Sequence, residues 1–530
     1  MYDILIKRAR IIDGTGSPSF WGDVAVQDGK IVGIGNDLGL AREICDADGL
    51  TLCPGFIDSH SHGDMMFELD PSFFQEVEQG VTTQIEGMCG ISAAPFSKTH
   101  LDSALEIAAT VVDCDFLQSA GCRFDYQQYL DHLEQIPAGN NYVLMVGHGT
   151  LRAFVMGMDD RDPTSAELHK MEETLRQCME AGALGISYGL QYPPGAYAST
   201  EEMVHLSSVA AKYNGVIAAH VRDEGNHLLE ADQEMIQVAQ SSHCKLVISH
   251  HKAINQPNWG KSQKTLSLIE QANQKGCNVY CDQYPYTASS TGLKSRIPQH
   301  LHSLGENQLI SLMSDLGQKT MMRNAILAGM NPEQRFGTTM FGASSAHPEY
   351  TGKMVLDVAR DLKKDPCELV MDVLCDDHLT TNGIYFCMQD EDVERIMRYP
   401  RTMIGSDGLY YKGCAGVHPR AFGTFLRVLG EYVREKKILK WEDAVRKMTS
   451  LPAQVYGLQT KGLIRIGMDA DLVLFNPETI KDLATFTDSK KRGQGIVYVW
   501  IGGKCVVKDD VFQGVMEGKL LRHGKGDSFY

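Results

Sequence analysis

The apolar positions of this chain change their spacing twice along its length, and the changes divide it into three parts. Residues 1–53 contain short apolar-rich runs, DILIKRARIID, DVAVQDGKIVGIG and LTLCPG, which Gly and Asp turns separate. The C-terminal part has the same pattern of short apolar-rich runs separated by turn residues, in GLIRIGMDADLVLFNP and GIVYVWIGGKCVVKDD. Short runs bounded by turn residues predict strands. We expect residues 1–53 and 455–530 to build one small β-sandwich domain around an inserted central domain.

Between these ends, short apolar runs alternate with stretches of helical spacing. Eight alternations of strand and helix are typical of an α/β fold of the (β/α)8 type, a TIM-like barrel, whereas a doubly wound parallel sheet is the alternative. The prediction is a (β/α)8 barrel over residues 54–454. Its eight predicted strands lie at residues 55–62, 82–89, 142–149, 184–190, 216–221, 246–251, 278–284 and 402–407.

One predicted helix shows both the helical spacing of apolar residues and a capping motif at its N-terminus. In TSAELHKMEETLRQCMEAGA, Thr164 and Glu167 have the spacing of a capping box, which satisfies backbone N–H groups at a helix start. We interpret the apolar positions that follow as core packing. Residues 293–350 have a sequence pattern typical of helices and loops, and they do not fit the strand–helix alternation of the barrel. We predict that they form an insertion or lid. The apolar positions of the helix are Leu168, Met171, Leu175 and Met179.

Composition and charge narrow the function classes. The 530 residues are 43% hydrophobic and 22% charged, as in ordinary globular proteins. A net charge of −17 argues against a nucleic-acid-binding protein, which needs a basic surface. No stretch approaches the ~18 uncharged apolar residues that span a membrane, so we expect no membrane partner.

The ends and the cysteines favour a cytoplasmic protein. The N-terminus, MYDILIKRARIIDG, lacks the apolar core of about 7–15 residues expected in a signal peptide. The 14 cysteines are scattered and form no CxxC pair. This pattern favours reduced thiols over a secreted disulfide framework. The sequence contains no coiled-coil heptad repeat, so it leaves the oligomeric state open.

Candidate metal ligands follow five of the eight predicted strands. In a barrel of this kind the functional side chains stand at the carboxyl ends of the strands. Nitrogen and sulfur donors with one carboxylate form the ligand set that zinc prefers. Those ends carry His60 and His62 in DSHSHGD, Cys89 in IEGMCG, His220 in IAAH, His250 in VISHHK and Asp407 in MIGSD.

Each of these residues alone is a weak signal. A lone histidine at a strand end is more often structural than a ligand, and a lone Cys89 is more often a small buried hydrophobe. His60 and His62, however, project to the same face, because side chains alternate along a strand. Six donors at one level of one predicted barrel are the stronger observation, and they predict a metal site.

A series of motifs gives the chain a resemblance to a known family. They are PGFIDSHSHGD, GMCGISAAP, VGHGTLR, GALGISYGLQYPPGAYASTEE, AAHVRDEG, ISHHK, DQYPYTASST, SDG and HPRAFGTF, followed by GMDADLVLFNP. In this order they resemble the D-aminoacylases, the N-acyl-D-amino-acid deacylases of the amidohydrolase superfamily, over nearly the whole chain. The HxH pair alone indicates the superfamily, whereas the Cys motif with YPYTASST and HPRxxGTF is specific to this branch.

The resemblance implies a zinc-dependent metallo-hydrolase barrel. It implies that Cys89, His220 and His250 hold one zinc ion tightly, and that Asp407 is the general acid/base. Met88 and Gly63 depart from the residues expected in the family, and they leave the preferred acyl group and side chain open. A weaker or optional second metal position is implied at His60 and His62, with Cys89 and Asp407. The residues implied to bind the substrate carboxylate are Lys252, Tyr284, Ser290 and Arg420, with Tyr192 beside them.

The predicted function is hydrolysis of N-acyl-D-amino acids, small molecules, to a carboxylate and a free D-amino acid. The D preference comes from the resemblance. A cyclic-amide hydrolase of the hydantoinase or dihydroorotase type is the first alternative. Such enzymes usually carry a metal-bridging lysine on the fourth strand, where this chain has GALGISYGL. A non-catalytic scaffold is the second alternative, and it would be expected to lack metal ligands that this chain keeps.

Overall fold

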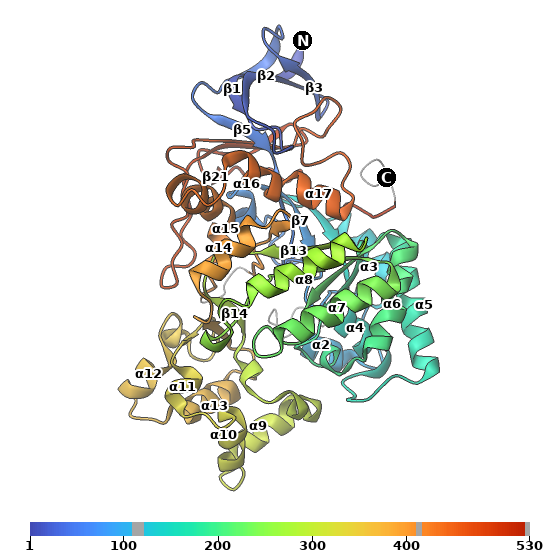
Figure 1. The fold of residues 1–530 in the computed structure, drawn as a ribbon, viewed down its shortest axis with the longest axis vertical. Helices are drawn as coiled ribbons and strands as arrows, with labels where there is room; N and C mark the ends of the chain where they lie inside the picture. The colour runs from blue at the N-terminus through green and yellow to red at the C-terminus, as the bar shows by residue number, and fades with distance from the viewer. Residues whose placement is uncertain (109–120, 410–415, 525–530) are drawn as a thin grey trace.

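Three parts follow one another along the long axis of the molecule (Figure 1). The computed structural model describes residues 1–108, 121–409 and 416–524. A small β domain that contains the N-terminus stands at one end, a barrel of strands and helices fills the middle, and an inserted layer of helices lies at the other end. This is the arrangement of a (β/α)8 barrel with a small β domain.

The β domain is one nine-stranded sheet to which both ends of the chain contribute. Its strands run in the order β21-β20-β19-β18-β5-β1-β2-β3, and β4 also pairs with β1. Antiparallel pairing of Leu474 with Leu52 joins the C-terminal strands to the N-terminal ones. Buried side chains from both ends, including Ile6 and Trp500, form the core. The strands are β1 (Tyr2–Ile11), β2 (Phe20–Gln27), β3 (Lys30–Gly35), β4 (Ala41–Asp46), β5 (Thr51–Pro54), β18 (Leu472–Phe475), β19 (Ile496–Ile501), β20 (Lys504–Lys508) and β21 (Val511–Phe512).

The barrel strands lie at the eight places that the sequence predicts. They pair in parallel as β6-β7-β8 and as β9-β10-β11-β12-β13-β17. The first group joins the second through Leu184, whose N–H donates to the carbonyl of Leu144 at 2.8 Å. The barrel closes where the N–H of Ser59 donates to the carbonyl of Ile404 at 3.3 Å. The strands are β6 (Phe56–Asp58), β7 (Val81–Glu86), β8 (Asn141–Leu144), β9 (Val146–Gly147), β10 (Gly185–Gly189), β11 (Val216–His220), β12 (Lys245–Ile248), β13 (Val279–Gln283) and β17 (Thr402–Ile404).

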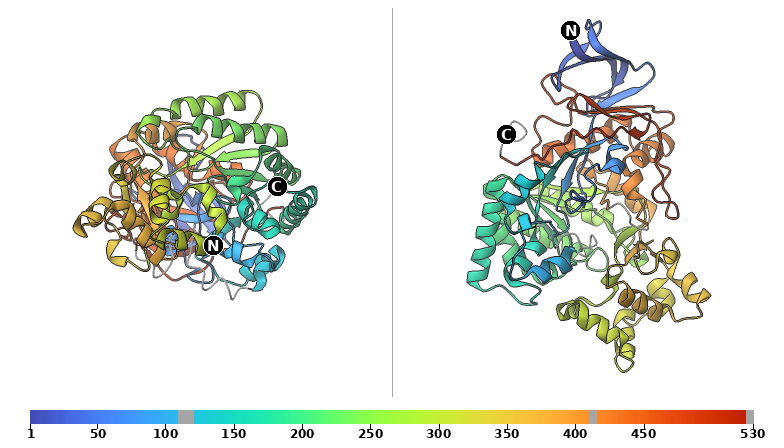
Figure 2. Two further views of the ribbon diagram at one scale, coloured as in Figure 1. Left: turned by 90° about the horizontal axis from the view of Figure 1, so that it is seen from below. Right: turned by 180° about the vertical axis from the view of Figure 1, so that it is seen from behind.

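Helices surround the strands, as the view along the long axis shows (Figure 2). The capping box predicted for α5 (Ser165–Ala181) is present, because the side chains of Thr164 and Glu167 each accept a backbone N–H of the other residue. Met171, Leu175 and Met179 are buried along this helix, as core packing requires. The other helices of this part are α1 (Phe74–Val77), α2 (Leu101–Ala108), α3 (Tyr126–Leu133), α4 (His148–Met156), α6 (Thr200–Lys212), α7 (Leu228–Ser242), α8 (Ser262–Gln274), α14 (Asp390–Arg398), α15 (Arg420–Arg427), α16 (Trp441–Met448) and α17 (Ser450–Tyr456).

The inserted layer lies between β13 and α14 and has a core of its own. A three-stranded sheet, in the order β14-β16-β15, joins it to the barrel. Buried side chains such as Leu309, Phe336 and Leu374 pack together inside it. The layer extends beyond the predicted insertion at residues 293–350, because two of its helices, α12 and α13, follow residue 350. The elements are β14 (Ser289–Gly292), α9 (Glu306–Ser314), α10 (Lys319–Leu327), α11 (Pro332–Phe336), β15 (Thr339–Phe341), α12 (Val355–Asp361), α13 (Pro366–Asp376) and β16 (Asn382–Tyr385).

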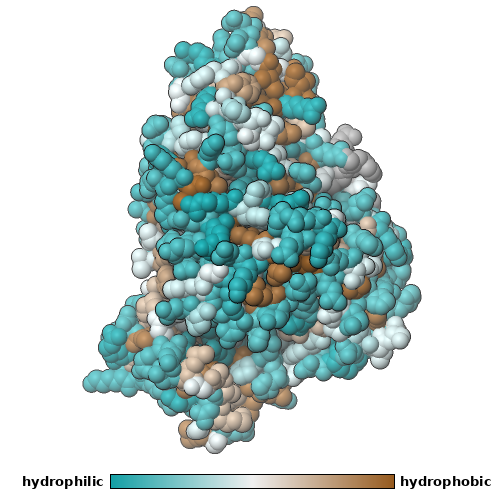
Figure 3. All heavy atoms as spheres, viewed as in Figure 1, coloured by the Kyte–Doolittle hydropathy of each residue, from teal (hydrophilic) through white to brown (hydrophobic). Residues whose placement is uncertain are grey.

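The last described residues return to the barrel. The N–H of Leu521 donates to the carbonyl of Tyr142 at 2.8 Å, at the start of β8, and its side chain packs against the apolar cluster inside the barrel. The face drawn in Figure 3 is largely polar, with apolar side chains in small separate patches. None of the described helices combines the length and the apolar character that a membrane crossing requires.

Candidate metal centre and substrate cavity

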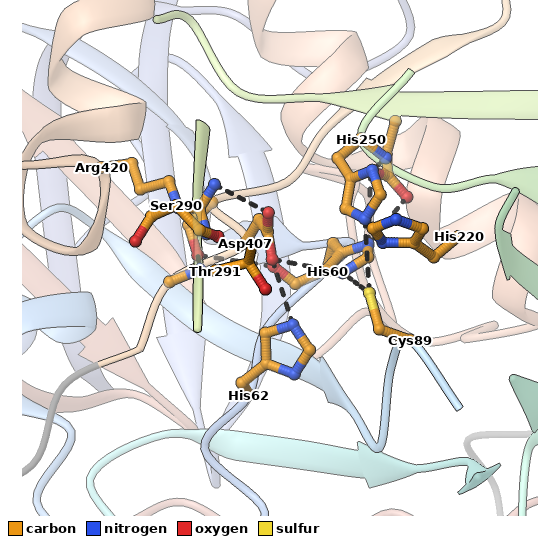
Figure 4. Close-up of polar contacts among 12 residues, drawn as sticks. His60, His62, Cys89, His220, His250, Ser290, Thr291, Asp407 and Arg420 are labelled. Carbon is orange, nitrogen blue, oxygen red and sulfur yellow. Dashed lines mark hydrogen bonds and ion pairs between the residues drawn. The ribbon is translucent and has the colours of Figure 1, made fainter. Parts of the chain in front are cut away.

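The six candidate ligands lie together at the carboxyl ends of five barrel strands, where Figure 4 shows them close to one another. The Sγ atom of Cys89 lies 3.4 Å from Nε2 of His60 and 3.3 Å from Nε2 of His250. Nε2 of His62 lies 3.0 Å from Oδ1 of Asp407. Ligand atoms of His60, Cys89, His250 and Asp407 all lie within 4.8 Å of one another. This spacing suits donors that share one metal ion.

His220, the last residue of β11, lies at the side of this group. Its ring meets the ring of His250 edge-on, with centroids 4.5 Å apart. Its Nε2 atom lies 2.7 Å from the side-chain oxygen of Gln191, whereas its Nδ1 atom is buried and has no hydrogen-bond partner in the described part of the chain. Buried polar atoms are normally paired, so an unpaired ring nitrogen beside other donors fits a metal ligand.

The backbone is strained at three of these residues. Cys89, His250 and Asp407 follow three different strands, and their φ angles are 54°, 35° and 49°. Residues other than glycine rarely adopt this left-handed conformation, and it costs free energy that functional sites tend to store. After Cys89 the chain passes so close to β10 that a Cβ atom on Gly90 would lie 2.6 Å from the backbone nitrogen of Gly189. The strand ends therefore turn sharply where the donors are needed.

Two carboxylates that the sequence did not identify orient the histidine rings. Oδ2 of Asp282 lies 3.4 Å from Nδ1 of His60. Oε1 of Glu224 lies 3.1 Å from Nδ1 of His250. Nζ of Lys252 also lies 2.7 Å from Nδ1 of His250, and an ammonium can only donate. When either ring binds a metal through Nε2, which faces Cys89 in both rings, its Nδ1 carries a proton that the neighbouring carboxylate can accept. This is the outer-shell arrangement that metal-binding histidines use.

Charges around the site favour the ionised forms of its acids. Burial opposes ionisation of the Cys89 thiol, but the charges of His60 and His250 hold its pKa well below the usual value of a thiol. Burial also opposes ionisation of Asp407, yet Arg420 and then His250 hold the pKa of its carboxyl well below the ordinary range. A thiolate and a carboxylate are donors that match zinc, and a zinc ion that bound these imidazoles would displace their protons.

The two cations predicted to bind the substrate carboxylate already have partners within the protein. The ammonium group of Lys252 contacts the carboxylate of Glu224. Nη1 of Arg420 lies 2.8 Å from Oδ2 of Asp407. The ring of Tyr284 lies between them, with its centroid 4.6 Å from the Arg420 guanidinium and 5.7 Å from the Lys252 nitrogen. The Tyr284 hydroxyl is buried and has no hydrogen-bond partner among the described residues, so it is available to a ligand.

The remaining predicted residues line the same cavity. The carbonyl of Ser290 accepts a hydrogen bond from Nη2 of Arg420 at 3.3 Å. The hydroxyl of Tyr192 lies 3.0 Å from that of Thr291, the next residue of β14. The cavity extends from His62 and Cys89 to the inner wall of the inserted layer. All the predicted site residues line this one cavity except His60, whose Nε2 atom lies behind it, 3.4 Å from Sγ of Cys89.

His148, in the motif VGHGTLR, does not line this cavity. Its Nε2 atom lies 2.8 Å from Oε1 of Glu202, and Nη1 of Arg152 donates to Oε2 of the same carboxylate at 2.5 Å. All three side chains are buried between α4 and α6. We interpret them as a structural network that ties two barrel helices together.

The glycine at position 63 has a packing explanation. Its N–H donates to Oε2 of Glu86 at 2.5 Å, and a Cβ atom at this position would lie 2.7 Å from Oε1 of Glu86. Burial, and then the charge of Asp64, raise the pKa of Glu86 to about 8. A larger residue after the HxH pair would displace this buried carboxyl.

Comparison with known proteins extends these observations to the whole chain. Residues 43–282 and 356–507 match the amidohydrolase family. The chain is 36% identical to a D-aminoacylase of Alcaligenes xylosoxydans xylosoxydans over 98% of this chain and 97% of the relative. It is 35% identical to an N-acyl-D-aspartate deacylase of the same organism over 98% of this chain and 95% of the relative.

Solved structures give the same result. The N-acyl-D-glutamate deacylase of Bordetella bronchiseptica, complexed with zinc and a phosphonate inhibitor, superposes with a TM-score of 0.84 at 34% identity, over 98% of this chain and 99% of the other. An L-hydantoinase of Arthrobacter aurescens superposes over 98% of this chain and 100% of the other with a TM-score of 0.56 at 16% identity. That second likeness is one of fold alone.

Proposed function

We propose, from the premise that this chain belongs to the amidohydrolase family and to its branch of N-acyl-D-amino-acid deacylases, that it hydrolyses the amide bond of N-acyl-D-amino acids. The products are a carboxylate and a free D-amino acid. One observation carries the proposal: the sulfur of Cys89 stands within 3.4 Å of two histidine nitrogens in a chain that matches these deacylases from end to end.

The proposal assigns the metal to residues of this site. We infer that Cys89, His220 and His250 hold one zinc ion tightly, in agreement with their donor types and with the unpaired Nδ1 of His220. His60 and His62, with Cys89 and Asp407, would form a weaker second position. A zinc ion, when bound, acidifies a water molecule and polarises the acyl carbonyl.

Asp407 is the proton carrier in this proposal. Its carboxylate is buried, lies beside His62, and is ionised because Arg420 holds its pKa low. It accepts a proton from the attacking water and returns it to the leaving amide nitrogen. Positioned general acid–base groups of this kind contribute about 10²–10⁴ in rate.

The substrate carboxylate is assigned to the cationic side of the cavity. Arg420 offers a planar fork that suits a carboxylate, and Lys252 adds a point charge. The unpartnered hydroxyl of Tyr284 lies between the two cations. Ser290 and Tyr192 complete the wall. Fixing the carboxylate here and the acyl carbonyl at the metal leaves the α-carbon little freedom, so the enzyme should distinguish the two enantiomers.

We also propose a cytoplasmic location. The eleven cysteines whose side chains the structure describes are free thiols, and Cys178, Cys244 and Cys281 are buried. Free thiols persist where the environment is reducing. Fractionation of the native cells would test this: activity in the soluble cytoplasmic fraction is expected, and activity confined to the exterior would contradict it.

Amino-acid release from matched N-acetyl-D and N-acetyl-L substrates tests the proposed function. The zinc-loaded protein should release amino acid from the D series alone, and removal of zinc with a chelator should stop the release. Release from the L series at a similar rate would refute the assigned specificity. No release, combined with opening of a hydantoin ring, would favour the cyclic-amide alternative, although β10 reads GISYG and offers no bridging lysine.

A further inference from the structure

His418 joins the two segments that carry residues predicted to bind the substrate carboxylate. Its Nδ1 atom accepts the backbone N–H of Arg420 at 3.1 Å, and its Nε2 atom lies 3.0 Å from the carbonyl oxygen of Ala288. Arg420 begins α15, and Ala288 is the buried residue directly before β14, which contains Ser290. One imidazole ring therefore connects the start of a barrel helix to the base of the inserted layer.

The two hydrogen bonds require one particular form of the imidazole. A ring nitrogen that accepts an N–H carries no proton, whereas a ring nitrogen that faces a carbonyl oxygen must donate one. His418 is therefore neutral, with its proton on Nε2. Burial, and then the charge of Arg420, hold the pKa of His418 well below its usual value. The protein thus keeps the ring in this form, and both ring nitrogens are used within the protein.

Aromatic side chains fix the orientation of this ring. It meets the rings of Tyr286 and Phe486 edge-on, with centroids 5.2 Å and 5.1 Å away. The ring of Tyr284, on which the Arg420 guanidinium lies, is 6.2 Å away. A buried ring packed on several sides cannot turn without losing these contacts. The His418 imidazole therefore acts as a rigid spacer between its two backbone partners.

Arg420 needs such a support because it is the first residue of a helix. The first N–H groups of a helix have no acceptor inside the helix, and the preceding residue, Pro419, has no side-chain oxygen to offer. Nδ1 of His418 supplies the acceptor. From this fixed start the Arg420 guanidinium reaches Oδ2 of Asp407 at 2.8 Å and the carbonyl of Ser290 at 3.3 Å (Figure 4). Movement of the helix start would disturb both contacts.

We propose that His418 is a positioning residue, which sets the guanidinium of Arg420 at the place where it receives the α-carboxylate of the substrate. The inference rests on the proposed function of the same site. His418 lines the cavity, but a proton carrier needs a ring nitrogen that can reach the substrate, and both of its nitrogens already have backbone partners. It therefore acts through Arg420.

Three substitutions of His418 separate its two hydrogen bonds. His418→Leu removes both. His418→Asn keeps an acceptor for the Arg420 N–H, because an asparagine side chain readily binds the backbone N–H two residues further on. His418→Gln places its amide nitrogen farther out, where it can donate to the carbonyl of Ala288. The three variants are assayed with the N-acetyl-D-amino acid that the wild-type enzyme hydrolyses fastest.

The expected effect falls on KM. A clamp displaced by about 1 Å costs up to about 100-fold, so His418→Leu should raise KM by about 10- to 100-fold. Its kcat should change less, because Arg420 holds the carboxylate in the ground state and the transition state alike. His418→Asn should restore most of the lost affinity, and His418→Gln should restore much less. All three variants should keep the zinc content of the wild-type enzyme, since His418 contacts none of the proposed ligands.

His302 of the inserted layer provides a matched control. It is also buried, its Nε2 atom lies 3.2 Å from the carbonyl oxygen of Ile297, and burial lowers its pKa to about 4. It is not among the described residues that line the substrate cavity. His302→Leu should lower the temperature of unfolding, as His418→Leu does, and should leave KM unchanged.

Several results would overturn the inference. They are an unchanged KM in His418→Leu, a loss confined to kcat, and a rescue by His418→Gln that equals the rescue by His418→Asn. If His418→Leu does not fold, the comparison of the Asn and Gln variants decides alone. In contrast, a wild-type enzyme that hydrolyses no N-acyl-D-amino acid refutes the proposed function itself.

Discussion

Replacing Glu224 with glutamine should weaken zinc binding although Glu224 is not assigned as a ligand. Its carboxylate lies 3.1 Å from Nδ1 of His250 and also contacts the ammonium group of Lys252. Nζ of Lys252 lies 2.7 Å from the same nitrogen but can only donate, so Glu224 is the group that can accept the Nδ1 proton when Nε2 of His250, which faces Cys89, binds a metal. Glutamine keeps the shape of the side chain but removes the negative charge that stabilises a proton on Nδ1 of His250.

Two effects set the size of the change. Loss of an outer-shell partner costs about 10- to 100-fold in metal affinity, which corresponds to about 1.4–2.8 kcal/mol at 1.4 kcal/mol per factor of ten. The substitution also leaves Lys252 buried, at 5% exposure, without its carboxylate. Removing one partner of a buried ion pair destabilises a protein by about 3–5 kcal/mol. We therefore expect Glu224→Gln to lower both zinc affinity and thermal stability.

A competition titration of zinc against a chromophoric chelator measures the first effect, and thermal unfolding measures the second. Glu202→Gln is the matched control, because Glu202 is also buried and also pairs with a histidine and a cation, His148 and Arg152, away from the site. Both variants should lose stability, and only Glu224→Gln should lose zinc affinity. A zinc dissociation constant within about twofold of wild type, or an equal loss in Glu202→Gln, would refute the reasoning.

Three further predictions follow from the same geometry. Asp407→Asn should keep the tightly bound zinc but lose about 10²–10⁴ in kcat, and near-normal turnover would remove its assigned role. Cys89→Ala should lower the zinc content measured by atomic absorption, and an unchanged stoichiometry would exclude Cys89 as a ligand. Because burial raises the pKa of Glu86 to about 8, the folded state holds its proton through a range where the unfolded chain, with a pKa of about 4.3, has lost it. The contribution of Glu86 to stability is thus greatest below pH about 4 and is lost as the pH rises to about 8, by up to about 1.4 kcal/mol per pH unit. Urea unfolding at several pH values should show a smaller loss of stability over this range in Glu86→Gln than in wild type.

The parts of the fold that the sequence predicted depend on local patterns. An apolar run that ends in a histidine or a cysteine marks a buried strand and its polar end, so the positions of His60, Cys89 and His250 could be inferred. The capping box of Thr164 and Glu167 was equally local and is present. In contrast, the left-handed backbone at Cys89 has no signature in the residue type, because the close approach of two strands imposes it.

The partners of the charged residues could not be inferred in the same way. Lys252 and Arg420 have the residue types that bind a carboxylate, and the resemblance implied that role. That Glu224, 28 residues away in the chain, neutralises Lys252 depends on how β11 and β12 end side by side. Asp282 likewise reaches His60 across 222 residues. Sequence reasoning therefore identified the chemistry of the site but not its internal ion pairs.

The pairing of Arg420 with Asp407 predicts that substrate binding changes the proton affinity of the general base. In the free protein Arg420 lies 2.8 Å from Asp407 and holds the pKa of its carboxyl well below the ordinary range. Such a carboxylate is a weak base. A substrate carboxylate bound to Arg420 shares that positive charge and adds a negative one nearby, and both changes raise the pKa of Asp407 toward a value better suited to accept a proton.

The acidic limb of the pH profile of kcat/KM reports the free enzyme, whereas that of kcat reports the complex. We therefore expect the acidic limb of kcat to lie at higher pH than that of kcat/KM. Limbs at the same pH, or in the reverse order, would show that Arg420 keeps its full hold on Asp407 and that the substrate carboxylate binds elsewhere.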